Sequence, residues 1–360
     1  MKYPYNPLLG ANILPVDIVL APEWWNKNEK ITFDRDFFFH PLRRIEDEQK
    51  MEKILYERWG SYGMGSGRKE KKPEIGAVHL AAGFMLSEML GCKIIYSESH
   101  PPRVLPANRE NLSLSQDDAF RSETYRQFVE MKDDLKGRFG HISGDVNWGG
   151  VLNLAMDLRG NDILSEMMIN PDDVKQYFMQ IAGFLEKFTS EIQRETGTSS
   201  ISVNRVVRHL ESPVFLHSEC THTMISAEDY ENYLLDIDIA WSRHRPFGIH
   251  YCGSDPHRMA ASFAKIPNLD FLDVGWGGNI KMIREYLPDT FLNIRLSPVE
   301  ISNMSEDDLS LTIERLVRES GNPYLTGVCC INMDDNVSEN KISTIFKTVE
   351  ELKRKMIGQL

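Results

Sequence analysis

The feature of this sequence that most constrains its fold is the alternation of short apolar segments with amphipathic segments after about residue 76. Alternating strands and helices predict parallel strands, in either a doubly wound sheet or a (β/α)8 barrel. The predicted strands are 92–96, 141–145, 201–203, 248–250, 271–274, 291–295 and 324–330, and the apolar segment 213–216 is ambiguous. The predicted helices are 77–90, 152–157, 171–195, 226–241, 279–286 and 338–356, with two more beginning near 256 and 305.

Two observations favour the barrel. No Gly-x-Gly-x-x-Gly turn follows a predicted strand, which disfavours a dinucleotide-binding sheet. Polar residues gather at the predicted strand ends, where (β/α)8 barrels carry their chemistry. These residues are Asp145, Glu219, His250, Cys252, Asp273, Arg295 and Cys330. We therefore predict an α/β fold, a single (β/α)8 TIM barrel.

The first 72 residues differ in character from the rest of the chain. Pro and aromatic residues dominate their start, a charged helical stretch covers about 46–58, and the basic run at 68–72 is typical of a solvated loop. We predict that residues 1–72 form an N-terminal extension that packs on a barrel formed by residues 73–360.

Composition and charge exclude several classes of function. The net charge of −12 and the pI near 5.4 disfavour binding to nucleic acid or to an anionic membrane. No segment has the apolar length of a membrane span, and the N-terminus does not resemble a signal peptide. The odd number of cysteines, five, is typical of a reduced protein. These features together predict a cytoplasmic protein.

A His-x-Cys pair, His250 and Cys252, ends one of the predicted strands. Side chains at positions i and i+2 of a strand point to the same side, so an imidazole and a thiol would meet there. Zinc prefers these ligands. A third could come from Cys329 or Cys330 at the end of a later strand, but neighbouring residues face opposite sides and the pattern leaves the choice open.

The remaining cysteines have simpler interpretations. A buried cysteine is common without any metal, and Cys92, at the start of a predicted strand, is expected in the core. Cys220 lies in the polar segment 217–222, where lining of the mouth or a plain loop is expected rather than a second metal site.

Several segments, in this order, resemble the uroporphyrinogen decarboxylase superfamily and its zinc- and cobalamin-dependent methyltransferase branch. The resemblance runs from about residue 76 to the C-terminus. The matching segments are 81–83 with 90–94, 150–160 with 170–174, 224–230, and the His-x-Cys-Gly sequence at 250–253. Cys330 lies nine residues before Glu339, the spacing of the family's last metal-binding cysteine, so the resemblance implies Cys330 rather than Cys329.

This resemblance implies a (β/α)8 barrel that binds Zn²⁺ through His250, Cys252 and Cys330. It also implies transfer of a methyl group between cobalamin, held on a small corrinoid protein, and a small-molecule thiol or methylated compound. The candidate catalytic residues are Glu219 and Asp273, and the candidate substrate-binding residues are His217, His222 and Trp276. A homodimer is left open.

Two other functions remain open at this level. The chain could be a decarboxylase acting on a tetrapyrrole, as in the other branch of the superfamily. The N-terminal Arg-rich motif of that branch has no counterpart here, which disfavours this reading. The chain could also be a non-catalytic corrinoid-binding partner.

Overall fold

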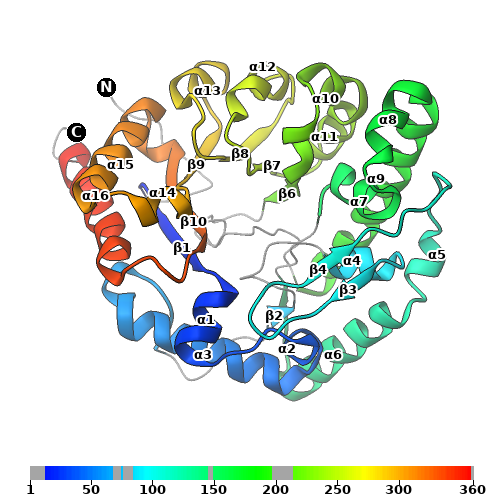
Figure 1. The fold of residues 1–360 in the computed structure, drawn as a ribbon, viewed down its shortest axis with the longest axis horizontal. Coiled ribbons are helices and arrows are strands. Elements are labelled where there is room, and N and C mark those ends of the chain that lie inside the picture. Colours follow the sequence, from blue (N-terminus) through cyan, green and yellow to red (C-terminus); the bar gives the residue numbers. More distant parts are fainter. Residues whose placement is uncertain (1–12, 68–73, 76–83, 145–148, 197–213, 358–360) are drawn as a thin grey trace.

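The computed structural model describes residues 13–67, 74–75, 84–144, 149–196 and 214–357. Its main sheet contains six parallel strands in the order β1-β10-β9-β8-β7-β6. The sheet curls around a central axis, and helices surround it on the outside (Figure 1). Its strands are β1 (Val16–Leu20), β6 (Phe215–Ser218), β7 (Phe247–Tyr251), β8 (Leu269–Val274), β9 (Phe291–Arg295) and β10 (Thr326–Met333).

Two short strand pairs complete the described strands. β2 (Glu74–Ile75) pairs in parallel with β5 (Ser143–Gly144), and β3 (Lys93–Ile95) forms an antiparallel hairpin with β4 (Arg103–Leu105). In Figure 1, β2 lies across the ring from the main sheet. The predicted α/β class is confirmed, with parallel strands arranged as part of a barrel. The predicted strand at 201–203 and most of the predicted helix at 77–90 lie outside the described residues.

The predicted helices that lie within the described residues are present, but the one at 226–241 is divided in two and the helix at 123–139 was not predicted. The starts of two of them show why they form. Ser226 and Asp229 form a complete capping box, and Ser305 accepts a hydrogen bond from the Asp308 amide at a second helix start. The helices are α1 (Pro22–Glu29), α2 (Arg35–Phe39), α3 (Pro41–Trp59), α4 (Phe84–Met89), α5 (Gln116–Ala119), α6 (Glu123–Phe139), α7 (Val151–Arg159), α8 (Asp162–Ile169), α9 (Pro171–Thr196), α10 (Ala227–Tyr233), α11 (Leu235–Ser242), α12 (Ala260–Phe263), α13 (Ile280–Tyr286), α14 (Pro298–Asn303), α15 (Glu306–Ser320) and α16 (Glu339–Ile357).

The N-terminal segment is more than an extension that packs on the barrel. β1 is a strand of the main sheet, where Asp17 lies beside Cys329 and Ile18 beside Cys330 of β10. The segment also contains the helices α1, α2 and α3. These helices bury its aromatic residues, including Trp25 and Phe37. A domain boundary at residue 72 would therefore separate β1 from the other strands of its sheet.

The core lies mainly between the sheet and the helices that cover it. On β7, Phe247, Ile249 and Tyr251 pack into a large apolar cluster with the helices, so His250 lies on the opposite, inner side of the strand. A second cluster packs α1–α3, α15 and α16 against β1 and β10. Among the described helices, none combines the length and apolar character that a bilayer span requires.

Candidate metal centre

Three side chains meet where β6 and β7 end. Among the described residues, Cys220, His250 and Cys252 bring two sulfur atoms and an imidazole nitrogen within 4.8 Å of one another. His250 is buried, whereas both cysteines are half-buried. The cluster is therefore closed on the protein side and still accessible from one direction.

The register of two neighbouring strands produces this meeting. Ser218 of β6 lies beside His250 of β7, and the Glu219 amide donates a hydrogen bond to the His250 carbonyl oxygen over 3.2 Å. Cys220 and Cys252 each follow this paired position by two residues. Because the strands are parallel, both cysteines leave the sheet at the same level and on adjacent strands.

A tight turn holds the Cys252 side of the cluster. Gly275, just after β8, approaches the backbone of residues 252–253 so closely that a Cβ atom there would lie 1.7 Å from the Gly253 carbonyl oxygen. Only glycine permits this contact between the loops that follow β7 and β8.

The imidazole of His250 has a fixed orientation. Its Nδ1 lies 2.7 Å from Oδ2 of Asp273, and the other oxygen of Asp273 accepts a hydrogen bond of 2.5 Å from Asn293 Nδ2. The carboxylate accepts the Nδ1 proton, so Nε2 is the nitrogen left to face the sulfur atoms. Metal-binding histidines are commonly held by a carboxylate in this way.

The two cysteines differ in their electrostatics. The hydrogen bond from Cys220 is the largest factor that lowers the pKa of Cys252 to about 4, with further lowering from His250 and Arg295, while burial opposes it. The same hydrogen bond and burial raise the pKa of Cys220. Burial alone would lower the pKa of His250, but hydrogen bonds to Asp273 and Cys252 raise it. The site thus already favours a thiolate at Cys252.

The donor set fits a metal ion. Two sulfur atoms and one oriented imidazole nitrogen are the borderline-soft ligands that zinc takes, and three protein ligands leave a position open for a substrate. Asp273 supplies the second layer of support that such sites need.

The predicted third ligand, Cys330, lies elsewhere. Its side chain is fully buried in the apolar cluster between β10 and the helices, and its sulfur lies 4.0 Å from the sulfur of Met333. Burial raises its pKa to about 12. Cys330 and Val328 share the outer side of β10, so Cys330 points away from His250 and Cys252. Cys220 occupies the place that the sequence assigned to Cys330.

Glu219, predicted as a catalytic residue, caps a helix instead. Its two carboxylate oxygens accept hydrogen bonds from the Leu152 amide (2.8 Å) and the Asn153 amide (3.0 Å) at the start of α7, and Thr221 donates a further one. The residue is fully buried. Gly150 makes room for it, because a Cβ atom there would lie 2.3 Å from Oε2 of Glu219.

His217 and His222 also lie away from the mouth. His217 is fully buried, with Nδ1 at 2.7 Å from Oδ1 of Asp238. Burial opposes protonation of His217, but Asp238 and Glu219 raise its pKa to about 9. The ring of His222 packs against Tyr230 and Phe263, and burial lowers its pKa to about 3. Both histidines belong to the layer between sheet and helices, so neither lines the mouth as predicted.

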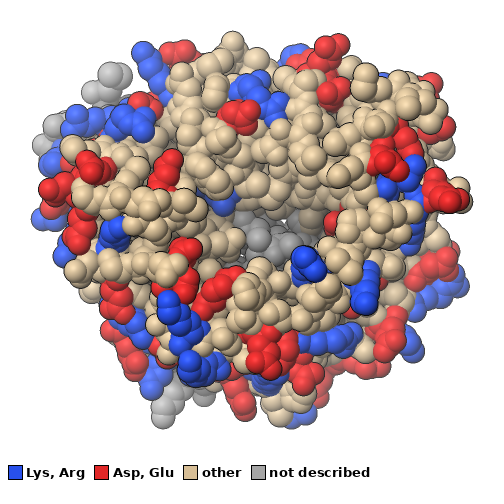
Figure 2. Space-filling model, in the orientation of Figure 1, with Lys and Arg blue, Asp and Glu red and all other residues tan. Residues whose placement is uncertain are grey.

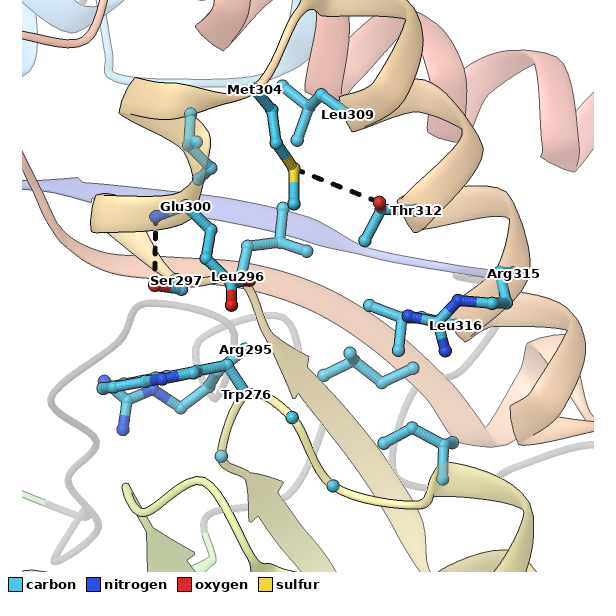
Figure 3. Close-up of a pocket in the computed structure, with 16 residues that line it drawn as sticks. Trp276, Arg295, Leu296, Ser297, Glu300, Met304, Leu309, Thr312, Arg315 and Leu316 are labelled. Carbon is cyan, nitrogen blue, oxygen red and sulfur yellow. Dashed lines mark hydrogen bonds between the residues drawn. The ribbon is translucent and has the colours of Figure 1, made fainter.

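Trp276 lies beside a cavity and contacts Arg295, for which the sequence suggested no separate role. The Trp276 ring centroid is 5.4 Å from Cζ of Arg295, the last residue of β9. Both residues line a cavity of about 260 Å³ that also borders α14 and α15, and Figure 3 shows the ring lying along the arginine side chain. The space-filling view is hollowed at the centre of this face of the molecule (Figure 2).

Comparison with solved structures finds a similar fold. A methyltransferase from Methanosarcina mazei superposes with a TM-score of 0.63, and the match covers 95% of both chains at 13% sequence identity. No family model matches the sequence, and no curated protein matches it. This likeness establishes a shared fold over almost the whole chain.

Proposed function

We propose that this protein is a zinc-dependent methyltransferase that moves a methyl group between cobalamin on a small corrinoid protein and a small-molecule substrate. The observation that carries the proposal is the convergence of Cys220, His250 and Cys252 at the ends of β6 and β7. The structural neighbour is a methyltransferase, which is consistent with the proposal.

In this proposal the residues of the chain have separate tasks. Cys220, His250 and Cys252 hold the ion, which lowers the pKa of a thiol or polarises a methylated compound bound at the open position. Asp273 keeps the proton on Nδ1 of His250 and so keeps Nε2 directed at the sulfur atoms. The half-buried setting of the cluster limits water around the reacting atoms.

The atoms and electrons of the methyl transfer balance without a further reactant. When a thiol accepts the methyl group, a sulfur–carbon bond forms and the cobalt–carbon bond of methylcobalamin breaks. The electron pair of the broken bond stays on cobalt, and the thiol proton passes to solvent. Transfer from a methylated compound to the corrinoid follows the same path in reverse.

An assay with free methylcobalamin tests this proposal. Purified zinc-loaded protein is incubated either with methylcobalamin and a panel of thiols or with cob(I)alamin and a panel of methoxy compounds. The loss or gain of the cobalt–carbon bond is followed by the absorbance of the corrinoid. We expect methyl transfer that a Cys252→Ala variant loses and a Cys92→Ala variant keeps, because Cys92 is not a member of the cluster and its thiol bonds the Asp157 carbonyl oxygen. Turnover of uroporphyrinogen without methyl transfer would contradict the proposal and favour a decarboxylase.

A further inference from the structure

The two cysteines of the cluster lie on turns that the sheet itself does not hold together. The pairing of β6 with β7 ends where the Glu219 amide bonds the His250 carbonyl oxygen. The Cys220 turn (residues 220–225) and the Cys252 turn (residues 252–258) both follow this last backbone bond. Segments beyond the end of a sheet open more easily than its strands. The spacing of the two sulfur atoms therefore depends on other contacts.

Arg258 supplies a contact between the two turns. It lies in the 3-10 helix Pro256–Met259, and its two Nη atoms donate hydrogen bonds to the carbonyl oxygens of His222 and Ile225 in the Cys220 turn. Among the described residues, the other hydrogen bond between the turns is a weak one of 4.0 Å from a cysteine sulfur. A guanidinium that donates through two N–H groups fixes direction as well as distance.

The guanidinium of Arg258 is itself held by β7. Its Nε lies 2.9 Å from Oδ2 of Asp255, and Oδ1 of Asp255 accepts a hydrogen bond of 2.8 Å from the Tyr251 hydroxyl. Tyr251 is fully buried in the apolar core and directly precedes Cys252 in the chain. The contacts therefore run from the core of the barrel through Arg258 to the Cys220 turn.

The two turns also pack closely against each other. Gly253 leaves the room that the Thr223 methyl occupies, because a Cβ atom at Gly253 would lie 2.1 Å from Cγ2 of Thr223. The Thr223 hydroxyl donates a hydrogen bond of 3.2 Å to the Cys220 carbonyl oxygen. The hydrogen bonds of Arg258 thus hold together two turns that already fit each other next to the sulfur atoms.

We propose that Arg258 is a positioning residue, which holds the Cys220 turn against the Cys252 turn so that one soft ion can bind both sulfur atoms. The inference rests on the proposed function only in taking that ion to be zinc. Among its described contacts, Arg258 bonds neither sulfur, so it acts through the backbone of the Cys220 turn. Zinc binds each thiolate at about 2.3 Å, so a small separation of the turns should weaken binding without unfolding the protein.

Arg284 offers a matched control, because it makes the same kind of contact at the other end of the strands. Its guanidinium donates hydrogen bonds to the carbonyl oxygens of Ser320, Thr290 and Leu325, and the last two directly precede β9 and β10. Substitution of either arginine removes hydrogen bonds to loop carbonyls, so both variants should lose some stability. Only substitution of Arg258 should disturb the metal centre.

Zinc affinity, measured by competition with a chromophoric chelator, tests the proposal. We expect Arg258→Gln to bind zinc about tenfold more weakly than wild type or worse, because outer contacts of a metal site contribute to its affinity. Arg258→Lys should recover part of the loss, since an ammonium can still reach one carbonyl. Arg284→Gln should bind zinc as the wild type does. Wild-type zinc affinity in Arg258→Gln would overturn the proposal.

Cobalt substitution provides a spectroscopic signature that lower stability alone would not change. In protein loaded with Co²⁺ in place of zinc, absorption from thiolate to cobalt reports the sulfur atoms that bind the ion. We expect this absorption to fall in Arg258→Gln and to stay at the wild-type level in Arg284→Gln. An equal fall in both variants would mark Arg258 as merely structural and contradict the proposal.

A probe that needs no metal separates this proposal from the proposed function. Phenylarsine oxide bonds two thiols at once, with release of water, when their sulfur atoms lie close together. Metal-free wild type, with folding checked by circular dichroism, should capture it through Cys220 and Cys252, and Cys220→Ala should not. Capture by Arg258→Gln should be weaker than by Arg284→Gln. If the wild type transfers no methyl group and binds no zinc, the proposed function fails, while arsenical capture still decides the role of Arg258. Equal capture by Arg258→Gln and wild type, or no capture by wild type, would overturn that role.

Discussion

The imidazole of His250 shows how neighbouring residues give a common side chain the orientation that a metal ligand needs. A His-x-Cys pair at a strand end has no fixed orientation by itself, because the imidazole can rotate. Asp273 accepts the Nδ1 proton and is held in turn by Asn293, so the ring presents Nε2 to the sulfur atoms. Asp273, predicted as a catalytic residue, uses both carboxylate oxygens to bond His250 and Asn293 in this structure.

We expect Asp273→Asn to weaken zinc affinity by roughly 10- to 100-fold, because the amide no longer fixes the charge and orientation of the imidazole. Competition with a chromophoric chelator measures this. Asp270→Asn is a matched control on the same strand, since Asp270 accepts a hydrogen bond from the Phe247 amide and, within the described part of the chain, bonds no member of the cluster. Equal affinities in the two variants would rule out the role given to Asp273.

A half-buried carboxyl in α7, that of Asp157, makes stability depend on pH. Burial raises the pKa of Asp157 from 3.8 to about 6, although the Ser87 hydroxyl donates a hydrogen bond to it. The folded state therefore binds this proton more tightly than the unfolded state does, and the resulting stabilisation is lost as the pH rises through 6.

The free energy of unfolding should fall by about 2.4 kcal/mol between pH 4 and pH 8 through this group alone. Asp157→Asn removes the ionisation while keeping a hydrogen-bonding partner for Ser87. Urea unfolding at both pH values should show a smaller fall in the variant than in the wild type. Identical pH dependence in the two proteins would show that Asp157 does not titrate in this way.

At the scale of elements, a residue that follows β6 caps the start of α7 next to the candidate metal centre. Glu219 follows β6 and accepts hydrogen bonds from the first amides of α7, and Cys220 comes next in the chain. The cap therefore anchors the backbone that carries one ligand. Glu219 therefore positions the backbone around Cys220. In the sequence alone, a carboxylate after a strand is easily taken for an acid–base residue.

A variant at this cap separates the two roles. Glu219→Gln keeps one acceptor oxygen but loses the charge and one amide partner, which should cost roughly 1–3 kcal/mol of unfolding free energy. Methyl transfer per folded, zinc-loaded molecule should stay close to wild type. If stability were unchanged and turnover lost, Glu219 would be catalytic, as the sequence had predicted.

For the whole molecule, the sequence predicted the architecture better than the contacts within it. The alternation of apolar and amphipathic segments predicted β9 residue for residue, because its apolar residues form a short segment between two helical patterns. It missed β1, whose place beside β10 depends on a pairing across almost the full length of the chain.

The site shows the same limit. His250 and Cys252 were predicted to lie together because their geometry is local to one strand. Cys220 depends on the register between β6 and β7, which no local pattern encodes, although its place just after a strand was a usable signal. Cys330 was chosen for its spacing to Glu339, which does not encode the side of the strand that a residue faces. The structure places its side chain in the outer apolar cluster, away from His250 and Cys252.

Zinc content of single-cysteine variants tests the central claim most directly. After dialysis against zinc and then buffer, metal per folded chain is measured by mass spectrometry, with circular dichroism to confirm folding. We predict about one zinc in the wild type and in Cys330→Ala, and a loss of most of it in Cys220→Ala and Cys252→Ala. Retention of zinc by Cys220→Ala together with its loss from Cys330→Ala would contradict this account of the site.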